Sequence, residues 1–135
     1  MDIDDAIGKL DVPILFAVEN GSRAWGLESK DSDFDVRFVY HREVEDYLGL
    51  GRISEVIELA FDEEGNRVDA CEALIDMVGF DIYKFAGLLA KSNPTMIEWL
   101  CTDIIYHGKR PEAFVKFARE EYNPKALYHH YRSMC

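Results

Sequence analysis

Short apolar runs separated by turn residues begin the chain, and they predict two strands. An acidic opening over residues 2–10 is expected to form a short helix. The run PILFAV at residues 13–18 is rich in β-branched and aromatic residues and is bounded by Pro and Asn-Gly, which is typical of a buried strand. The run FDVRFVY at residues 34–40 predicts a second strand.

Two further apolar segments, residues 52–61 and residues 67–80, flank the polar sequence DEEGN. Strand-like runs on either side of a short turn that contains Gly predict a hairpin. We therefore expect these two segments to pair with each other across residues 63–66.

From Asp81 onward the apolar positions recur at intervals of three and four, which predicts helices. Asp81 is a suitable N-cap for the first helix, and the Asn-Pro pair at residues 93–94 marks its end and opens the next. Pro111 and a second Asn-Pro pair at residues 123–124 each begin a further helical run. Strands followed by helices describe an α+β domain, with a small mixed β-sheet flanked by helices and a helical C-terminal part.

The size of the chain predicts one domain. Its 135 residues are 48% hydrophobic, which is enough for one core and too short for two ordinary domains. We therefore expect a single domain over residues 1–135. Because the last helical pattern stops without a Gly or Asn cap, we expect this domain to be truncated at its C-terminal end.

Charge and hydropathy limit the partners. The 15 basic and 26 acidic residues give a net charge of -11, which opposes binding to a long polyphosphate backbone. We expect no extended basic nucleic-acid-binding surface, and any nucleotide would have to be held locally by metal ions. No apolar run is long enough for a membrane helix, and the N-terminus lacks the pattern of a signal peptide. The expected location is the cytoplasm, with no membrane contact.

Asp33 and Asp35 are candidate metal ligands. Side chains two apart on a strand point to the same side, about 6.6 Å apart along the chain. Phe34, Val36 and Phe38 take the opposite face and are expected to anchor the strand in the core. Two carboxylates on one face repel each other unless a cation lies between them. Mg²⁺ prefers a few carboxylate oxygens together with water and substrate phosphate, so the pair predicts a magnesium site.

A third aspartate, Asp31, comes directly before this strand and is interpreted as part of the turn. A calcium loop of the EF-hand type that began at Asp31 would need Glu at its twelfth position. That position is Arg42, so we set this alternative aside.

Gly21 and Ser22 follow the first predicted strand at a turn that we expect to lead into a helix. Gly21 would permit close backbone approach, and the Ser22 hydroxyl would donate to a phosphate oxygen. Arg23 and Lys30 are the nearest cations that could compensate the remaining phosphate charge. These four residues are the predicted nucleotide-binding set.

The segment GSRAWGLESKDSDFDVRFVY resembles the signature of the DNA polymerase beta-like nucleotidyltransferase superfamily, a Gly-Ser pair followed by Asp-x-Asp. More narrowly, this segment and the later sequences YLGL, VGFDIYKF and KSNPTMIEWL resemble the RNA repair pathway DNA polymerase beta family of predicted nucleotidyltransferases. The resemblance covers residues 16–131.

This resemblance implies a small mixed sheet flanked by helices, and transfer of a nucleoside monophosphate from an NTP to an acceptor hydroxyl with release of pyrophosphate. The implied cofactor is Mg²⁺, with Mn²⁺ as an alternative. By the same resemblance, Gly21 and Ser22 match the phosphate-binding pair, and Asp33 and Asp35 match two metal-binding aspartates.

The superfamily's third carboxylate lies on a later neighbouring strand, and two residues compete for this role. Asp76 lies within the last predicted strand, whereas Asp81 sits at a helix start, where capping is the ordinary explanation. We favour Asp76, which would hold the catalytic metal and help to draw a proton from the acceptor hydroxyl. Asp69 is a weaker choice because it lies near the predicted turn.

Three functions are compatible with these residues. The first is nucleotide transfer to an RNA end or another nucleotide-bearing acceptor, as in RNA repair. The second is a metal- and nucleotide-binding module without transfer activity. The third is modification of a partner protein, since superfamily members paired with toxins transfer AMP to a tyrosine.

Overall fold

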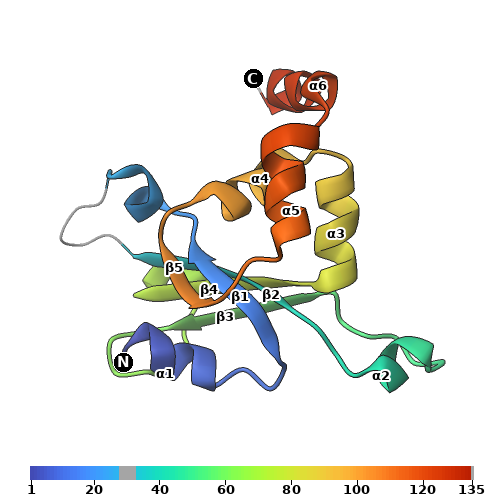
Figure 1. The fold of residues 1–135 in the computed structure, drawn as a ribbon. Coiled ribbons are helices and arrows are strands. Elements are labelled where there is room, and N and C mark those ends of the chain that lie inside the picture. The colour runs from blue at the N-terminus through green and yellow to red at the C-terminus, as the bar shows by residue number, and fades with distance from the viewer. Residues whose placement is uncertain (28–32, 135) are drawn as a thin grey trace.

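The protein is an α+β chain in which a five-stranded mixed sheet has helices on both faces, as the sequence predicts (Figure 1). The computed structural model describes residues 1–27 and 33–134. The strands are β1 (Ile14–Glu19), β2 (Phe34–Tyr40), β3 (Val56–Phe61), β4 (Ile75–Asp81) and β5 (Ile105–Gly108). The helices are α1 (Ile3–Gly8), α2 (Val44–Leu48), α3 (Ile82–Ala90), α4 (Pro94–Cys101), α5 (Glu112–Lys116) and α6 (Pro124–Met134). Three short helical segments are η1 (Ser22–Trp25), η2 (Ala70–Glu72) and η3 (Phe117–Glu121).

The sheet consists of two antiparallel pairs that meet at a parallel junction. Its strand order is β3-β4-β2-β1-β5. β1 pairs with β2 and β3 pairs with β4, both antiparallel, whereas β2 and β4 run parallel to each other at the centre. β5 adds an antiparallel edge strand beside β1. We call the contact between β2 and β4 the central seam.

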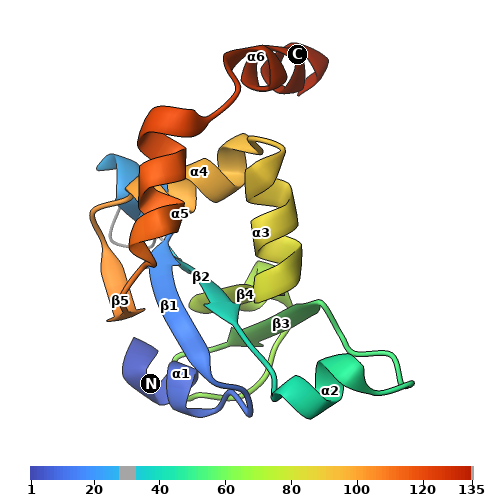
Figure 2. The same ribbon diagram turned by 45° about the vertical axis from the view of Figure 1, so that its right-hand side comes forward.

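Each face of the sheet carries its own hydrophobic cluster. Val36 and Phe38 lie in a cluster with α1, and Phe34 packs against it, so the predicted core face of β2 is confirmed. Val39 points the other way and packs with residues of α3 and α4, including Trp99. Figure 2 shows α1 below the sheet, and α3, α4 and α5 above it.

The predicted strands at residues 13–18 and 34–40 are confirmed as β1 and β2. The predicted hairpin is wrong in its second strand, whereas its turn is present: the Asp62 N–H donates to the Asn66 carbonyl at 3.1 Å, and Phe61 and Arg67 form an isolated antiparallel bridge. β3 and β4 do pair antiparallel, but β4 begins at Ile75, and residues 62–74 form a longer connection that contains η2. Asp69 and Glu72 are exposed in this connection, so a strand there would have no buried face to gain.

Two short elements were not predicted. β5 has four residues, of which three are exposed and only Tyr106 is half-buried, so its apolar pattern is too short to predict a strand. α2 has five residues and buries none of them. Contacts with the surrounding structure determine both elements, because neither has a periodic pattern of apolar residues that would predict it.

The helices begin where capping residues and prolines predict. The side chains of Asp81 and Asn93 cap the first turns of α3 and α4, and Pro94 is the first residue of α4. Pro111 is the N-cap of α5, which continues into the π-helical turn η3, and Pro124 begins α6. Within the described part of the chain, no helix is long and apolar enough to cross a membrane.

Candidate functional site

An acid pair lies at the end of the sheet where β2 and β4 begin. In the parallel register of the central seam, Asp35 stands directly opposite Asp76, although all of β3 separates them in sequence. Residues opposite each other on neighbouring strands point to the same face. By alternation from Val39, this is the face that α3 and α4 cover further along the strands. The two carboxylates are therefore neighbours on one surface.

Arg37 lies between these two acids. It is two residues beyond Asp35 on β2, so it shares their face. Its Nη2 atom is 3.3 Å from Oδ2 of Asp76 and 3.8 Å from Oδ1 of Asp35. Its Nη1 atom donates to the backbone carbonyls of Val36 and Asp76, at 3.1 and 3.3 Å. The guanidinium group thus contacts both carboxylates and two backbone carbonyls.

The electrostatics of Asp35 reflect this crowding. Burial raises the pKa of the Asp35 carboxyl above its usual value, and the Arg37 charge opposes that rise. The negative charges of Asp76 and Asp33 raise the pKa further. A second cation near Asp35 would therefore favour its ionised form.

The turn after β1 lies against the acid pair. A Cβ atom at Gly21 would collide with the carboxylate of Asp35, so only glycine lets the chain pass this close. The expected helix after this turn is the single 3₁₀ turn η1, which begins at Ser22. The guanidinium of Arg23 stacks over the ring of Phe34, 3.9 Å from its centroid. Lys30 lies outside the described residues, as does Asp31.

Glu19 fixes this turn to the sheet, although reasoning from the sequence did not single it out. Its side chain is completely buried at the end of β1. Its carboxylate accepts hydrogen bonds from the backbone N–H groups of Gly21 and Asp35, at 2.7 and 3.2 Å, and from the Tyr106 hydroxyl at 3.0 Å. Burial, followed by the Glu19 charge, raises the pKa of Tyr106, which keeps this hydroxyl a donor. The sequence feature that could have pointed to Glu19 is its place as an acid at the end of an apolar run, directly before Asn-Gly-Ser.

Asp33 does not join the other two acids in a common cluster. It is exposed and precedes β2, which starts at Phe34. It borders a hollow whose other charged residues are all acidic: Asp62, Glu63, Glu64 and Glu72. Among the described residues, no three His, Cys, Asp or Glu side chains are arranged to hold a metal ion. The strand begins one residue too late to fix Asp33 beside Asp35.

The two alternatives for the third acid lie at opposite ends of β4. Asp81 pairs with Tyr40, five positions along the strand from Asp76, which is about 16 Å at the usual rise. Its carboxylate accepts from the backbone N–H of Tyr83 at 2.9 Å and from the Tyr47 hydroxyl at 2.7 Å. Asp81 therefore caps α3 far from Asp35, and this geometry favours Asp76 over it.

A hollow of about 320 Å³ adjoins Asp76 on the side away from the Gly21 turn. Asp69, the weaker choice for the third acid, lies on its wall with Glu58 and Arg67. Three of its four charged lining residues are acidic. The order across the sheet is thus the Gly21 turn, Asp35, Asp76 and then this hollow.

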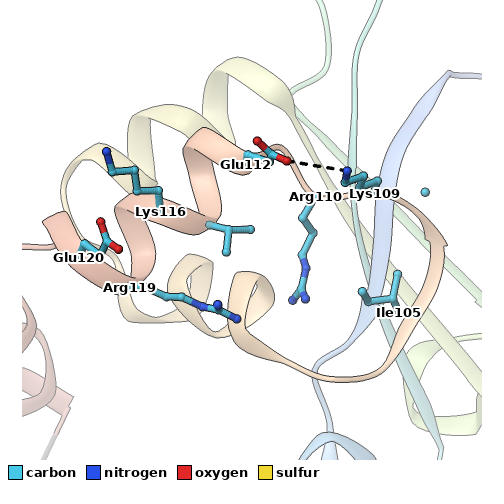
Figure 3. A pocket seen from close by; sticks show the side chains of 9 residues that line it. Ile105, Lys109, Arg110, Glu112, Lys116, Arg119 and Glu120 are labelled. Carbon is cyan, nitrogen blue, oxygen red and sulfur yellow. Dashed lines mark ion pairs between the residues drawn. The ribbon is translucent and has the colours of Figure 1, made fainter.

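A separate basic hollow of about 460 Å³ lies between β5 and α5, and no residue of the acid pair or the Gly21 turn lines it. In Figure 3 the Arg110 and Arg119 side chains extend into it. Arg110 donates to the carbonyls of Trp99 and Thr102, so it caps the end of α4. Lys109 pairs with Glu112 at 4.0 Å. Lys116 pairs with Glu121 at 3.9 Å, so three of the four cations that line this hollow have local partners.

The acid pair fits a divalent cation in chemistry and position. Both ligands are carboxylates, and their side chains keep 33% and 23% of their exposure, for Asp35 and Asp76 respectively. Arg37 already places one positive charge between them, so a metal ion would bind carboxylates that are partly compensated. Mg²⁺ in particular is commonly bound through one or two carboxylates plus substrate phosphates.

The mixed sheet, with Asp35 and Asp76 beside a Gly-Ser turn, agrees with the polymerase beta-like class that the motifs indicate. The chain belongs to the RNA repair pathway DNA polymerase beta family, whose model matches residues 2–135. This confirms the resemblance seen in the Gly-Ser and Asp-x-Asp motifs.

One relative is an uncharacterized protein, YcgL, from Bacillus subtilis (strain 168), which is 39% identical over 126 residues. The match covers 92% of this chain and 45% of the relative, so the chain spans less than half of that protein's length. No solved structure matches the chain.

Proposed function

We propose that the protein is a divalent-metal-dependent nucleotidyltransferase that moves a nucleoside monophosphate from an NTP to an acceptor hydroxyl. The observation that carries this proposal is the in-register pair of Asp35 and Asp76 beside the Gly21 turn, in a chain of a polymerase beta family. In this reaction the acceptor oxygen bonds to the α-phosphorus while the bond between the α-phosphorus and the bridging oxygen breaks. Pyrophosphate leaves, and the hydroxyl proton passes to a carboxylate or to solvent.

Each residue of the site has a separate task in this proposal. Asp35 and Asp76 would hold Mg²⁺ or Mn²⁺, and such an ion, when bound, neutralises charge that develops on the phosphate oxygens. Ser22 would bind the triphosphate through its hydroxyl, and Gly21, whose own N–H donates to Glu19, would let a phosphate approach the backbone closely. Because Gly21 contacts Asp35, phosphates held there adjoin the metal ligands. Asp76 would accept the proton of the acceptor hydroxyl.

The other predicted residues have supporting tasks. Asp33, directly before β2, would add a metal ligand by turning its side chain toward Asp35, whose pKa its negative charge raises. Arg23 and Lys30 would compensate phosphate charge next to Ser22. Asp81 has no task in the reaction.

An RNA end is the acceptor that the family's description supports. A protein acceptor is a second candidate, because Glu58 and Asp69 make the hollow beside Asp76 acidic. An acidic wall disfavours the phosphates of a nucleic acid and favours a polypeptide hydroxyl flanked by basic residues.

The test is to incubate the protein with each NTP, labelled at the α-phosphate, and with Mg²⁺ or Mn²⁺, in the presence of RNA or of cell extract. We expect label in one acceptor class. Asp76→Asn should reduce the rate at least about a hundredfold, because it removes a metal ligand and a proton acceptor. The matched control is Asp81→Asn, which keeps a capping oxygen and should retain transfer.

The outcomes separate the candidate functions. Label in RNA supports RNA-end modification, and label in a protein supports the second candidate. Nucleotide binding without any transfer leaves the binding module. Transfer that survives Asp76→Asn but is lost in Asp81→Asn would show that the third acid is wrongly assigned.

A further inference from the structure

Arg37 is fixed at the position where the proposed function needs a metal cation. Its guanidinium group contacts Asp35 and Asp76 through Nη2, and its Nη1 atom donates to two backbone carbonyls. The Arg37 side chain keeps only 18% of its exposure. A planar guanidinium that donates to three acceptors and forms an ion pair with Asp35 cannot leave without losing several charge-assisted contacts.

This arrangement changes the charge of the site. Asp35 and Asp76 alone would present two negative charges on neighbouring strands, which repel each other. With Arg37 included, the three residues carry a net charge of about -1 when both acids are ionised. The acid pair is thus stable without metal, and its attraction for a divalent cation is weaker.

The contacts of Arg37 also divide the carboxylate oxygens. Arg37 approaches Oδ1 of Asp35, whereas Oδ2 of Asp35 faces Gly21, as its close approach to that residue shows. The oxygen that faces the Gly21 turn is directed toward the expected phosphates. A cation bound to this oxygen would also contact a phosphate. The negative charge of the phosphate would then offset the positive charge of Arg37.

We propose that Arg37 is a built-in counter-ion of the acid pair, and that it makes cation binding at Asp35 and Asp76 depend on bound nucleotide. Arg37 acts through the acids, so it is a positioning residue. The inference rests on the proposed function, because it takes the acid pair to be the metal site.

The test is a Mn²⁺ titration, with free Mn²⁺ followed by electron paramagnetic resonance, in the absence and presence of a non-hydrolysable ATP analogue, and with the Mn²⁺ that the analogue binds without protein measured and subtracted. We expect wild-type protein to bind Mn²⁺ at least about tenfold more tightly with the analogue than without it. Arg37→Gln should bind Mn²⁺ alone at least about tenfold more tightly than wild type, because one unit charge has been removed a few Å from a dication. In Arg37→Gln, the ratio between Mn²⁺ affinity with the analogue and without it should therefore be smaller than in the wild type.

Three further variants sharpen the result. Arg37→Lys keeps the charge but not the fork, so its affinity for Mn²⁺ alone should lie near the wild-type value. The double variant Arg37→Gln with Asp35→Asn should lose the increase in Mn²⁺ affinity seen in Arg37→Gln. This loss would show that the ion binds at the acid pair. Arg67→Gln removes a positive charge beside Asp76 without touching Asp35, and it should change Mn²⁺ affinity much less.

Failure of this inference differs from failure of the proposed function. If wild type binds Mn²⁺ with nucleotide but Arg37→Gln gains nothing, or if wild type already binds Mn²⁺ tightly alone, Arg37 does not impose the dependence. If neither protein binds Mn²⁺ even with nucleotide, both proposals fall. If Arg37→Gln does not fold, the wild-type comparison and Arg37→Lys still decide: equal wild-type affinities with and without nucleotide overturn the inference.

Discussion

Glu19 contacts both halves of the candidate site from a position that no solvent reaches. Its two carboxylate oxygens accept hydrogen bonds from the Gly21 turn, from the start of β2 and from β5. A buried carboxylate is tolerated when such donors surround it, and its removal leaves them without an acceptor. The Gly21 turn and Asp35 thus share one support.

We expect Glu19→Gln to loosen this support. The amide keeps one acceptor oxygen but turns an NH₂ group toward a donor, so the free energy of unfolding should fall by about 1–3 kcal/mol. Nucleotide affinity should also fall, because Gly21 is no longer held against Asp35. Denaturant unfolding and fluorescence titration with an NTP would measure the two effects.

The control for this change is Glu120→Gln, at an exposed position on η3. It should alter neither quantity beyond the usual range for surface substitutions. A Glu19→Gln protein with wild-type stability and wild-type nucleotide affinity would contradict the supporting role.

At this scale the sequence predicted part of the site. Alternation on β2 gave the face of Asp35, because Phe34, Val36 and Phe38 had to be buried. It did not reveal Arg37 as the neighbour of both acids, since that contact depends on the register between β2 and β4. No local pattern in the sequence encodes a pairing across the central seam.

Helix α3 has a capping residue at its start and a glycine in its interior. Asp81 caps its first turn, and Phe85 and Leu89 bury its inner face. Gly87 lies between them, where a glycine costs conformational entropy that alanine does not. A Cβ atom at this position would meet no heavy atom within 4 Å.

We therefore expect Gly87→Ala to raise the free energy of unfolding by about 0.5–1 kcal/mol. Urea denaturation would measure the change. Gly79→Ala on β4 is the matched contrast, because a Cβ atom there would collide with the Phe38 ring, and it should destabilise the protein. A loss of stability in Gly87→Ala would mean that α3 is under a constraint other than its own helix propensity.

At the scale of elements, prediction succeeded where a local signal marked a boundary. The Asn-Pro pairs and Asp81 fixed helix starts, and Pro and Asn-Gly bounded β1. Prediction failed for β5, which is short and mostly exposed at the sheet edge, and for residues 67–74, which precede β4 and contain η2 instead of continuing the strand. Tertiary contacts decide such segments.

The net charge of -11 affects the stability of the whole molecule. The ion pairs outside the site are exposed to a large degree, as in Lys109–Glu112 and Lys116–Glu121, and such pairs contribute little to stability. Repulsion among the excess carboxylates should therefore outweigh them in the folded state.

We expect added salt to stabilise the fold. Raising NaCl from about 20 mM to about 300 mM shortens the Debye length to less than about 8 Å and should raise the thermal midpoint by about 3 °C. Differential scanning fluorimetry would follow the shift, with sucrose as the uncharged control solute. A midpoint that falls with salt would mean that specific ion pairs, such as those of Arg37, outweigh the repulsion.

The central seam has a consequence for the order of folding. Each antiparallel pair joins strands that are neighbours in the chain, so each can close a short loop early. Asp35 belongs to one pair and Asp76 to the other, and they meet only when β2 docks on β4. A slip of one residue during docking would turn Asp76 to the opposite face. Chains with most of their strands already formed would therefore still lack the acid pair until this last step is complete.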